Sequence, residues 1–392
     1  MTIRTVRLNY SSTASGHIAP SGPEVSAVKL FAIIFLTCCA TLAQSAELIV
    51  RIKDAPSDGA LIFQVYDSAN AFGDFRDPAK ELRAELREDS TYLIDGVPAG
   101  DIALLVFADE NNNGVLDKNF IGIPKEALGI SNNYQPKGPP VFSRASFSAA
   151  DNETTPVDIQ LYKVLGERGR LGVGAGVIGR SSPYVGSNTT VLKAIPAITY
   201  NGERLQWLGP NIQYGIAGSG WWRLAASASY RVGVYEESDS VALAGMGDRD
   251  GTMMAGLGLR FEVPGGLNLS LRYEHDALDK IGGGAATARL SKGYQTGLFR
   301  FAPQLQVNWL SKELSNYDFG VSPQAATSTR PVYTTGSSLS YEVGFGSFIE
   351  LTEDWLIVLN VSAEFLPSEI VRSPIVSEDH VFKGFAAITY VF

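Results

Sequence analysis

The chain has 392 residues, a formal net charge of −9, 45% apolar residues and 19% charged residues. This length is enough for two domains, and an acidic balance without any basic cluster argues against a nucleic-acid-binding protein. Forty glycines and an aromatic share of 10% favour β-rich structure with many turns.

The first 46 residues have the pattern of an export signal. Lys29 precedes an apolar run over 30–42, and the small-residue stretch AQSAE follows it. This run is too short for a membrane-spanning helix, which needs roughly 20 residues. We therefore expect residues 1–46 to be a signal peptide with a presequence, cleaved after Ser45 or Ala46.

Both cysteines, Cys38 and Cys39, lie inside this segment. The mature chain is therefore expected to have no disulfide and no thiolate metal site. No later stretch has the pattern of a membrane helix, so we expect an exported chain that no helix anchors.

Residues 47–163 contain short alternating runs separated by Gly, Pro, Asp and Asn turns. ELIVRI, ALIFQVYD, STYLIDGV, IALLVFAD and VDIQLYK have the composition of strands. About seven strands in this length predict a small β-sandwich, which we place in the periplasm. The charged run Asp77 to Asp89 is either a short helix or a solvated edge strand, and residues 164–169 are the expected linker.

The segment DENNNGVLD places oxygen-bearing side chains at alternate positions around a glycine, at Asp109, Asn111, Asn113 and Asp117. These are positions 1, 3, 5 and 9 of an EF-hand loop, whose oxygen ligands suit Ca²⁺. Position 12 is Phe120 instead of a bidentate Glu, and no helix is expected before the loop. Two interpretations remain: a Ca²⁺ site of reduced affinity, and an Asx-rich turn held by its own side chains, which the missing ligand favours. No other cofactor is expected.

Residues 170–392 alternate apolar and polar side chains over longer segments. Segments of about ten residues suit tilted membrane strands, and aromatic residues gather at their ends, as in Trp221, Trp309 and Trp355. Tight links alternate with long ones, as short periplasmic turns alternate with long outer loops in membrane barrels. We expect an all-β chain with an antiparallel barrel of about 12 strands, or ten if the pair flanking Gly209-Pro210 does not form.

The last strand of this barrel is expected to close it against the first. Phe382, Ile388, Tyr390 and Phe392 share one parity of the final segment FKGFAAITYVF, which we expect to face lipid. An even number of strands places both barrel ends on one side of the membrane, the periplasm.

The polar parity of the barrel carries charges of both signs: Arg223, Arg231, Arg260, Arg272, Arg300, Lys383, Glu262, Glu274, Glu342 and Glu364. They indicate either a selective pore or a lumen closed by ion pairs, and the mixed signs favour the closed lumen.

The triplet Glu274, His275 and Asp276 raises the question of a barrel hydrolase. Consecutive strand residues point to opposite faces, which separates His275 from Glu274 and Asp276. His275 shares the lipid-facing parity and His380 lies in or beside an outer loop, so we expect no enzyme.

From about Val164 onward the chain resembles the MipA/OmpV family of outer-membrane proteins. The resemblance is carried, in order, by GVGAGV, SPYVGSNTTVLKAIPAITYNGERL, SNYDFGVSP, SYEVGFGSFIELTEDWLIVLNVSAEFLPSEIVRSPIVSED and GFAAITYVF. The preceding region resembles an uncharacterised family of exported β-sandwich domains through FADENNNGVLDKNFIGIPKEALGISNN. The fusion of the two is not the usual arrangement of the family.

The resemblance implies a barrel in the outer membrane, in contact with its lipid, that holds a murein hydrolase and a murein synthase together without catalysis of its own. A scaffold role is the first expectation. The alternative is a narrow pore or facilitator for a small solute.

Overall fold

The computed structural model describes residues 45–187, 191–218 and 220–392. The expected signal peptide, up to residue 44, lies outside the described residues. Among those described, no helix has the length and apolar character needed to cross a membrane.

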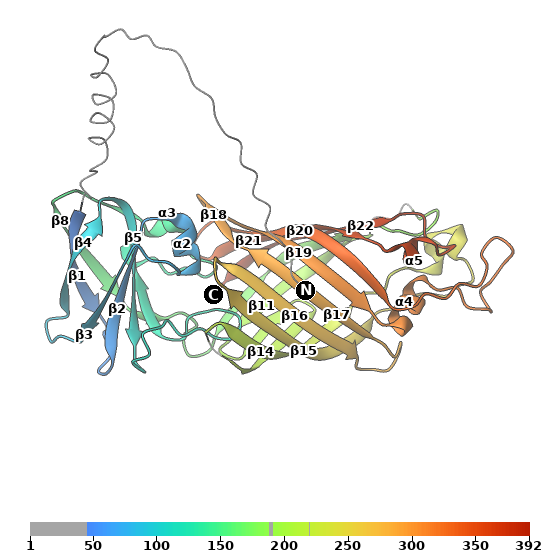
Figure 1. Ribbon diagram of the computed structural model, residues 1–392, viewed down its shortest axis with the longest axis horizontal. Helices are drawn as coiled ribbons and strands as arrows, with labels where there is room; N and C mark the ends of the chain where they lie inside the picture. The colour runs from blue at the N-terminus through green and yellow to red at the C-terminus, as the bar shows by residue number, and fades with distance from the viewer. Residues whose placement is uncertain (1–44, 188–190, 219) are drawn as a thin grey trace, which may run out of the picture. The chain divides into compact units, whose positions relative to one another are not determined.

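The described residues before 164 form nine strands in two sheets (Figure 1). The strands are β1 (Ser45–Lys53), β2 (Ala60–Tyr66), β3 (Lys80–Glu85), β4 (Thr91–Pro98), β5 (Gly100–Asp109), β6 (Ala127–Ile130), β7 (Phe147–Ala149), β8 (Thr154–Gln160) and β9 (Tyr162–Lys163). One sheet has the order β4-β1-β8, and the other β3-β2-β5-β6-β9 with β7 beside β5. Two short helices, α2 (Ala69–Asp74) and α3 (Phe142–Ala145), and a 3₁₀ turn, η1 (Ser131–Asn133), complete this part.

Alternating side chains from the two sheets form the core of the sandwich. Leu48 and Val50 on β1 belong to the same buried cluster as Phe63 on β2 and Val106 on β5. The charged run that the sequence left open is an edge strand, β3, whose residues alternate between half-buried and exposed. Charge on an edge strand discourages pairing with another chain.

The described residues after 169 form a closed antiparallel barrel of twelve strands (Figure 1), as predicted. They are β10 (Arg170–Arg180), β11 (Val191–Asn201), β12 (Leu205–Leu208), β13 (Asn211–Ala217), β14 (Trp222–Arg231), β15 (Thr252–Val263), β16 (Leu267–Asp276), β17 (Gly284–Lys292), β19 (Phe299–Leu310), β20 (Ser338–Glu350), β21 (Trp355–Phe365) and β22 (His380–Val391). A short β18 (Tyr294–Thr296) pairs with β19, and β17 pairs with β19 to complete the sheet.

The last strand closes the barrel as expected, because β22 pairs with β10 from Gly172↔Val391 to Arg180↔Lys383. Phe382, Ile388 and Phe392 are exposed on its outer face, whereas Ala387 and Val391 are buried. The parity predicted to face lipid is therefore the outward one. The same holds for Leu271 and Tyr273 on β16 and for Tyr341, Val343 and Phe345 on β20, which are all exposed.

The barrel strands are shortest at the hairpin of β12 and β13, which have 4 and 7 residues. β12 pairs with only three residues of β11, Thr199 to Asn201, and Gly209 N–H donates to the carbonyl of Ile198. Residues 192–197 of β11 therefore have a paired neighbour only on the β10 side among the described residues. Pro196 lies within this edge. Proline has no backbone N–H to donate to a neighbouring strand, and an edge position does not require one.

The two ends of the barrel differ in their connections. One end, called the turn end below, carries tight links such as residues 264–266, where Gly265 and Gly266 have φ of 80° and 78°. Such positive φ values suit tight hairpin turns. The other, the loop end, carries the long segments 232–251, 311–337 and 366–379. They include α4 (Lys312–Phe319), α5 (Ser368–Val371) and two 3₁₀ turns, η2 (Glu237–Asp239) and η3 (Val241–Leu243).

Candidate functional site: the barrel lumen and its two ends

A compact group of ion pairs lies on one wall of the lumen, on β20, β21 and β22. Lys383 Nζ lies 2.9 Å from a carboxylate oxygen of Glu342 and 2.7 Å from one of Glu364. The Asn308 amide donates to both carboxylates at 3.1 and 3.3 Å, and the Ser340 hydroxyl donates to Glu364. The predicted charges on this wall therefore satisfy one another, as in a filled lumen.

The opposite wall, on β14 to β17, carries arginines. Arg223 is buried and pairs with Glu262 at 2.7 Å, and Arg272 lies 3.9 Å from Glu274. Arg260 and Arg289 have no ion-pair partner among the described residues and donate instead to the amides of Gln213 and Gln306, respectively. This wall therefore retains positive charge that carboxylates do not neutralise.

The loop end is covered by an apolar cluster of its own. Its members come from all the long loops: Tyr184, Tyr235, Leu243, Met246, Phe319, Val321, Ala325, Ile370, Ile375 and Val376. Tyr184 and Tyr235 pack edge to face with ring centroids 4.7 Å apart. Arg330 donates to the carbonyls of Ala242, Ala244 and Ala325, and so ties two loops together. The long loops therefore fold into a cap rather than standing apart in solvent.

At the turn end, the barrel contacts residues of the sandwich, with which it forms one compact unit, Ser45–Phe392. Arg300 on β19 pairs with Asp74 and donates to the carbonyl of Gly73 at 2.6 Å. The Tyr134 hydroxyl donates to Glu350 at 2.5 Å, where both groups are buried. Burial and this hydrogen bond raise the pKa of the Tyr134 phenol, which keeps it a donor.

A second pair of contacts reinforces this junction. Lys137 lies 2.5 Å from Asp354 and donates to the Val391 carbonyl at 2.8 Å. The hydrogen bond from Lys137 lowers the pKa of the exposed Asp354 carboxyl. Gln295 on β18 donates to the Pro140 carbonyl at 2.8 Å. The turn end is therefore bound to the sandwich by several side chains from different strands.

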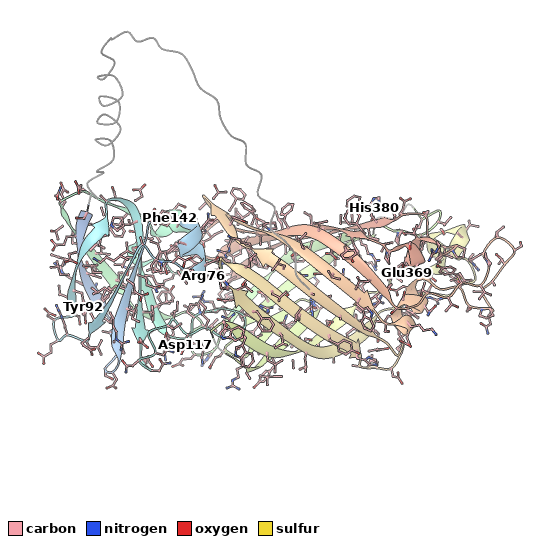
Figure 2. All side chains as sticks on the ribbon, viewed as in Figure 1. Arg76, Tyr92, Asp117, Phe142, Glu369 and His380 are labelled. Atoms are coloured by element: carbon pink, nitrogen blue, oxygen red, sulfur yellow. The ribbon has the colours of Figure 1, made fainter. Side chains whose placement is uncertain are left out.

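The Asp/Asn loop follows β5 directly, with a strand before it and no helix, as the sequence indicated; Asp117 is labelled in Figure 2. The buried Asp109 carboxylate accepts from Asn113 N–H at 2.9 Å and Gly114 N–H at 3.0 Å. It also pairs with Arg83 at 2.7 Å. These bonds are those of an Asx-rich turn.

The amides of the same loop surround Asp117. Asn111 donates to it at 2.8 Å and Asn113 at 3.3 Å. No three His, Cys, Asp or Glu side chains group as a metal site would in the part of the chain that the structure describes. The two amides face Asp117 with their nitrogens, and a bound Ca²⁺ would require their oxygens instead. The Ca²⁺ site over Asp109, Asn111, Asn113 and Asp117 therefore stays a prediction.

The carboxylate and imidazole of the triplet on β16 diverge as predicted. Glu274 accepts from the Ser229 hydroxyl on the lumen side at 2.9 Å, whereas His275 is exposed beside Tyr273, whose hydroxyl lies 3.4 Å from Nδ1. Asp276 is buried and accepts from Thr252 and the following turn. His380, labelled in Figure 2, begins β22, and its Nδ1 lies 2.7 Å from a carboxylate oxygen of the exposed Asp379. The three side chains of the triplet therefore do not form one site.

Several residues that organise these regions were missed by the sequence reasoning. Asp318 lies in α4 of a loop, Arg180 ends β10, and Glu350 ends β20. The partners of Glu350 and Asp318 are distant in sequence: Tyr134 and Glu350 are 216 positions apart, and Arg231 and Asp318 are 87 positions apart. Only the parity of Arg180 and Glu350 on polar strand faces could have singled them out.

Comparison with known proteins places both regions in families. The family model described as MltA-interacting protein MipA matches residues 173–392, and a model of an uncharacterised protein family found in bacteria matches residues 50–157. The outer membrane protein Omp26La of Vibrio anguillarum is 27% identical over 168 residues, which cover 40% of this chain and 61% of that protein. The chain therefore spans about three-fifths of the length of this relative.

Two other comparisons extend over more of the barrel. The MltA-interacting protein of Escherichia coli strain K12 is 27% identical over 228 residues, which cover 57% of this chain and 91% of the relative. Among solved structures, a FadL homologue of Pseudomonas aeruginosa covers 57% of this chain and 89% of its own, with 9% identity and a TM-score of 0.28. A score this low supports no argument about function.

Proposed function

The chain belongs to the MipA family, and from this premise we propose that it is a non-enzymatic structural protein of the cell envelope. In this proposal residues 170–392 anchor the chain in the outer membrane. Residues 47–163, joined by the linker 164–169, form a periplasmic module that contacts the machinery of murein synthesis.

The observation that carries the proposal is that groups of the chain itself occupy the barrel at three levels. The loop cap covers one end, the Lys383, Glu342 and Glu364 group lies in the lumen, and the sandwich contacts the other end through Arg300 and Glu350. A barrel of this size leaves little space once long side chains fill it. Such a molecule suits anchoring better than conduction.

The partner class comes from the relatives. The E. coli relative bears the name MltA-interacting protein, and this chain covers 91% of it. We take a murein hydrolase and a murein synthase as the partners, and the sandwich with the turn end as the contact surface, because both would lie on the side of the membrane where murein lies.

The anchoring role predicts the electrical behaviour of the purified chain in a planar bilayer. We expect no stable open level, because ion pairs occupy the lumen, the loop cap covers one end and the sandwich contacts the other end. The measurement is single-channel recording of the full chain, with a porin of known conductance as the positive control. A reproducible, long-lived open level would contradict the structural role.

Co-purification tests the partner side of the proposal. The full chain, tagged, is cross-linked in cells, solubilised mildly from the outer membrane and captured, with untagged cells as the control. We expect murein hydrolases and synthases among the captured proteins. Their absence from cross-linked material that retains the folded barrel would contradict the scaffold role while leaving the anchor intact.

The second candidate, a narrow facilitator for a small solute, is favoured by one observation. Arg260 and Arg289 lie on the lumen wall without a carboxylate partner among the described residues, and they donate to the side-chain amide oxygens of Gln213 and Gln306. An anion-selective current that falls in Arg289→Gln would support this candidate.

A further inference from the structure

A cavity of about 210 Å³ lies between the lumen and the loop cap, and it is partly open. It is smaller than the roughly 300–1,000 Å³ of sites for drug-sized ligands, so any occupant is small. Its lining includes five charged residues, Arg180, Arg231, Lys383, Asp318 and Glu364. The cavity lies apart from the sandwich and from the junction described above.

Arg180 is a charged lining residue that takes no part in the ion pairs of Lys383 with Glu342 and Glu364. It is directly opposite Lys383 across β10 and β22, and like charges in that position repel. Lys383 engages both nearby carboxylates, Glu342 and Glu364. Arg180 has no ion-pair partner among the described residues, and its buried Nε has no hydrogen-bond partner there. A buried guanidinium N–H without an acceptor costs free energy unless a ligand supplies one.

Two other residues that line the cavity, Arg231 and Asp318, also have unpartnered buried atoms. Arg231 pairs with Asp318 through one nitrogen and one oxygen, while its Nη1 and the Oδ1 of Asp318 have no partner among the described groups. Asp318 is 2% exposed, so its free oxygen is well buried. The residues that line the cavity therefore hold two guanidinium groups and one carboxylate that each have an unpaired polar atom.

Charge and polarity together define what would fit. The three cations of the lining are balanced by Asp318, Glu364 and the adjacent Glu342, which favours an occupant with no net charge. The side of the cavity towards the cap is apolar, formed by Val234, Phe319, Leu366 and Ile370. A neutral molecule that has a carboxylate, a cationic donor and an apolar body would satisfy all of these groups.

We propose that this cavity binds a small apolar amino acid as a zwitterion, with its carboxylate on Arg180 and Arg231, its ammonium group on Asp318 and its side chain against the cap. Charged hydrogen bonds of this kind contribute more than neutral ones. The inference does not depend on the scaffold role, because a structural barrel and a facilitator could each hold such a ligand.

The test is isothermal titration of the full chain in detergent with L-leucine and L-valine. The matched ligands are 4-methylpentanoate, which lacks the ammonium group, and 3-methylbutylamine, which lacks the carboxylate. We expect L-leucine to bind at least about tenfold more tightly than either of these two matched ligands, since each of them loses charged hydrogen bonds. Titration into empty micelles corrects for partition into detergent.

Two variants assign the contacts. Arg180→Gln is expected to weaken L-leucine at least about tenfold, and Asp318→Asn to make L-leucine and 4-methylpentanoate bind alike. Arg272→Gln, a lumen arginine that does not line the cavity, is the control and should bind as the native chain does. Folding of each variant is checked by the heat-dependent migration of the barrel in gels. No saturable binding to the folded native chain, or equal binding by Arg180→Gln, overturns the proposal.

Discussion

At the scale of single residues, the sandwich contains a carboxyl group whose charge opposes folding. Glu126 is 8% exposed, accepts from Asp117 N–H through one oxygen and leaves its Oε1 without a partner among the described residues. Burial raises the pKa of the Glu126 carboxyl from 4.5 to about 7, although the hydrogen bond from Asp117 lowers it. Asp117, Asp109 and Glu110 lie nearby and add to the shift.

The raised pKa of Glu126 determines how the stability of the folded sandwich changes with pH. A carboxyl whose pKa is higher in the folded chain contributes stability that is complete at low pH and is lost as pH rises through about 7. We expect Glu126→Gln to stabilise the sandwich at about pH 8, by on the order of 1–3 kcal/mol, and to change little at about pH 4. The measurement is hydrogen exchange of peptides from β5 and β6 in the full chain, corrected for intrinsic rates.

The same experiment bears on the Asp/Asn loop. A bound Ca²⁺ would neutralise the carboxylates of this region, so added Ca²⁺ would raise the protection of residues 109–126 at about pH 8 and a chelator would reverse the effect. The contact of Arg83 with Asp109 favours an unchanged result. Equal destabilisation by Glu126→Gln at both pH values would show that its charge is not what matters.

At the scale of elements, the strands were the most predictable part of the chain. On β16 and β20, apolar and polar side chains alternate over ten or more residues. This pattern is typical of a barrel strand with an apolar outer face and a polar inner face. The charged β3 could not be distinguished from a helix, because its edge position depends on β2 beside it. The α4 segment carries no strong apolar periodicity, and Asp318 acquired its place only through the folded cap.

The loop cap should behave as a separate element whose stability depends on Arg330. This side chain is 7% exposed and satisfies carbonyls of two different loops. Arg330→Ala removes the donor to the half-buried Ala242 carbonyl, the exposed Ala244 carbonyl and the buried Ala325 carbonyl, which we expect to cost on the order of 1–3 kcal/mol within the cap. Limited proteolysis should then cut segments 232–251 and 311–337 faster, while the barrel strands stay intact.

Arg372→Ala is the matched control for this element. Arg372 is an exposed arginine at the end of α5, with no ion pair among the described residues. Its removal should leave the cleavage rate unchanged. If both variants were cleaved at the native rate, Arg330 would not be the tie between the loops.

At the scale of the whole molecule, the contacts between sandwich and barrel could not be predicted from the sequence. Several of them join residues more than 200 positions apart, such as Tyr134 with Glu350 and Asp74 with Arg300. Patterns of period two reveal which face a side chain occupies, but not which distant group it meets. The sequence therefore predicted the barrel itself, but not the contacts between the barrel and the sandwich.

A double-mutant cycle measures how strongly the two parts are coupled. We expect Tyr134→Phe and Glu350→Gln to be non-additive by about 1–3 kcal/mol, because the bond between them is short and buried. Hydrogen exchange of residues 131–146 in the full chain reports the loosening. The pair Arg51 and Asp158, 3.7 Å apart with side chains 61% and 56% exposed, is the control and should show a coupling near zero. Equal coupling in both pairs would mean that the junction adds no stability.

The short hairpin of β12 and β13 also constrains the membrane around the molecule. Backbone groups that face hydrocarbon without a partner cost several kcal/mol each, so acyl chains cannot cover residues 192–197 of β11, which among the described residues pair with β10 alone. The bilayer has to thin beside this sector while it keeps its full thickness beside the long strands β19 and β20. Lipids that tolerate a thinner leaflet should therefore gather along one flank of the barrel and give it a preferred orientation towards its neighbours.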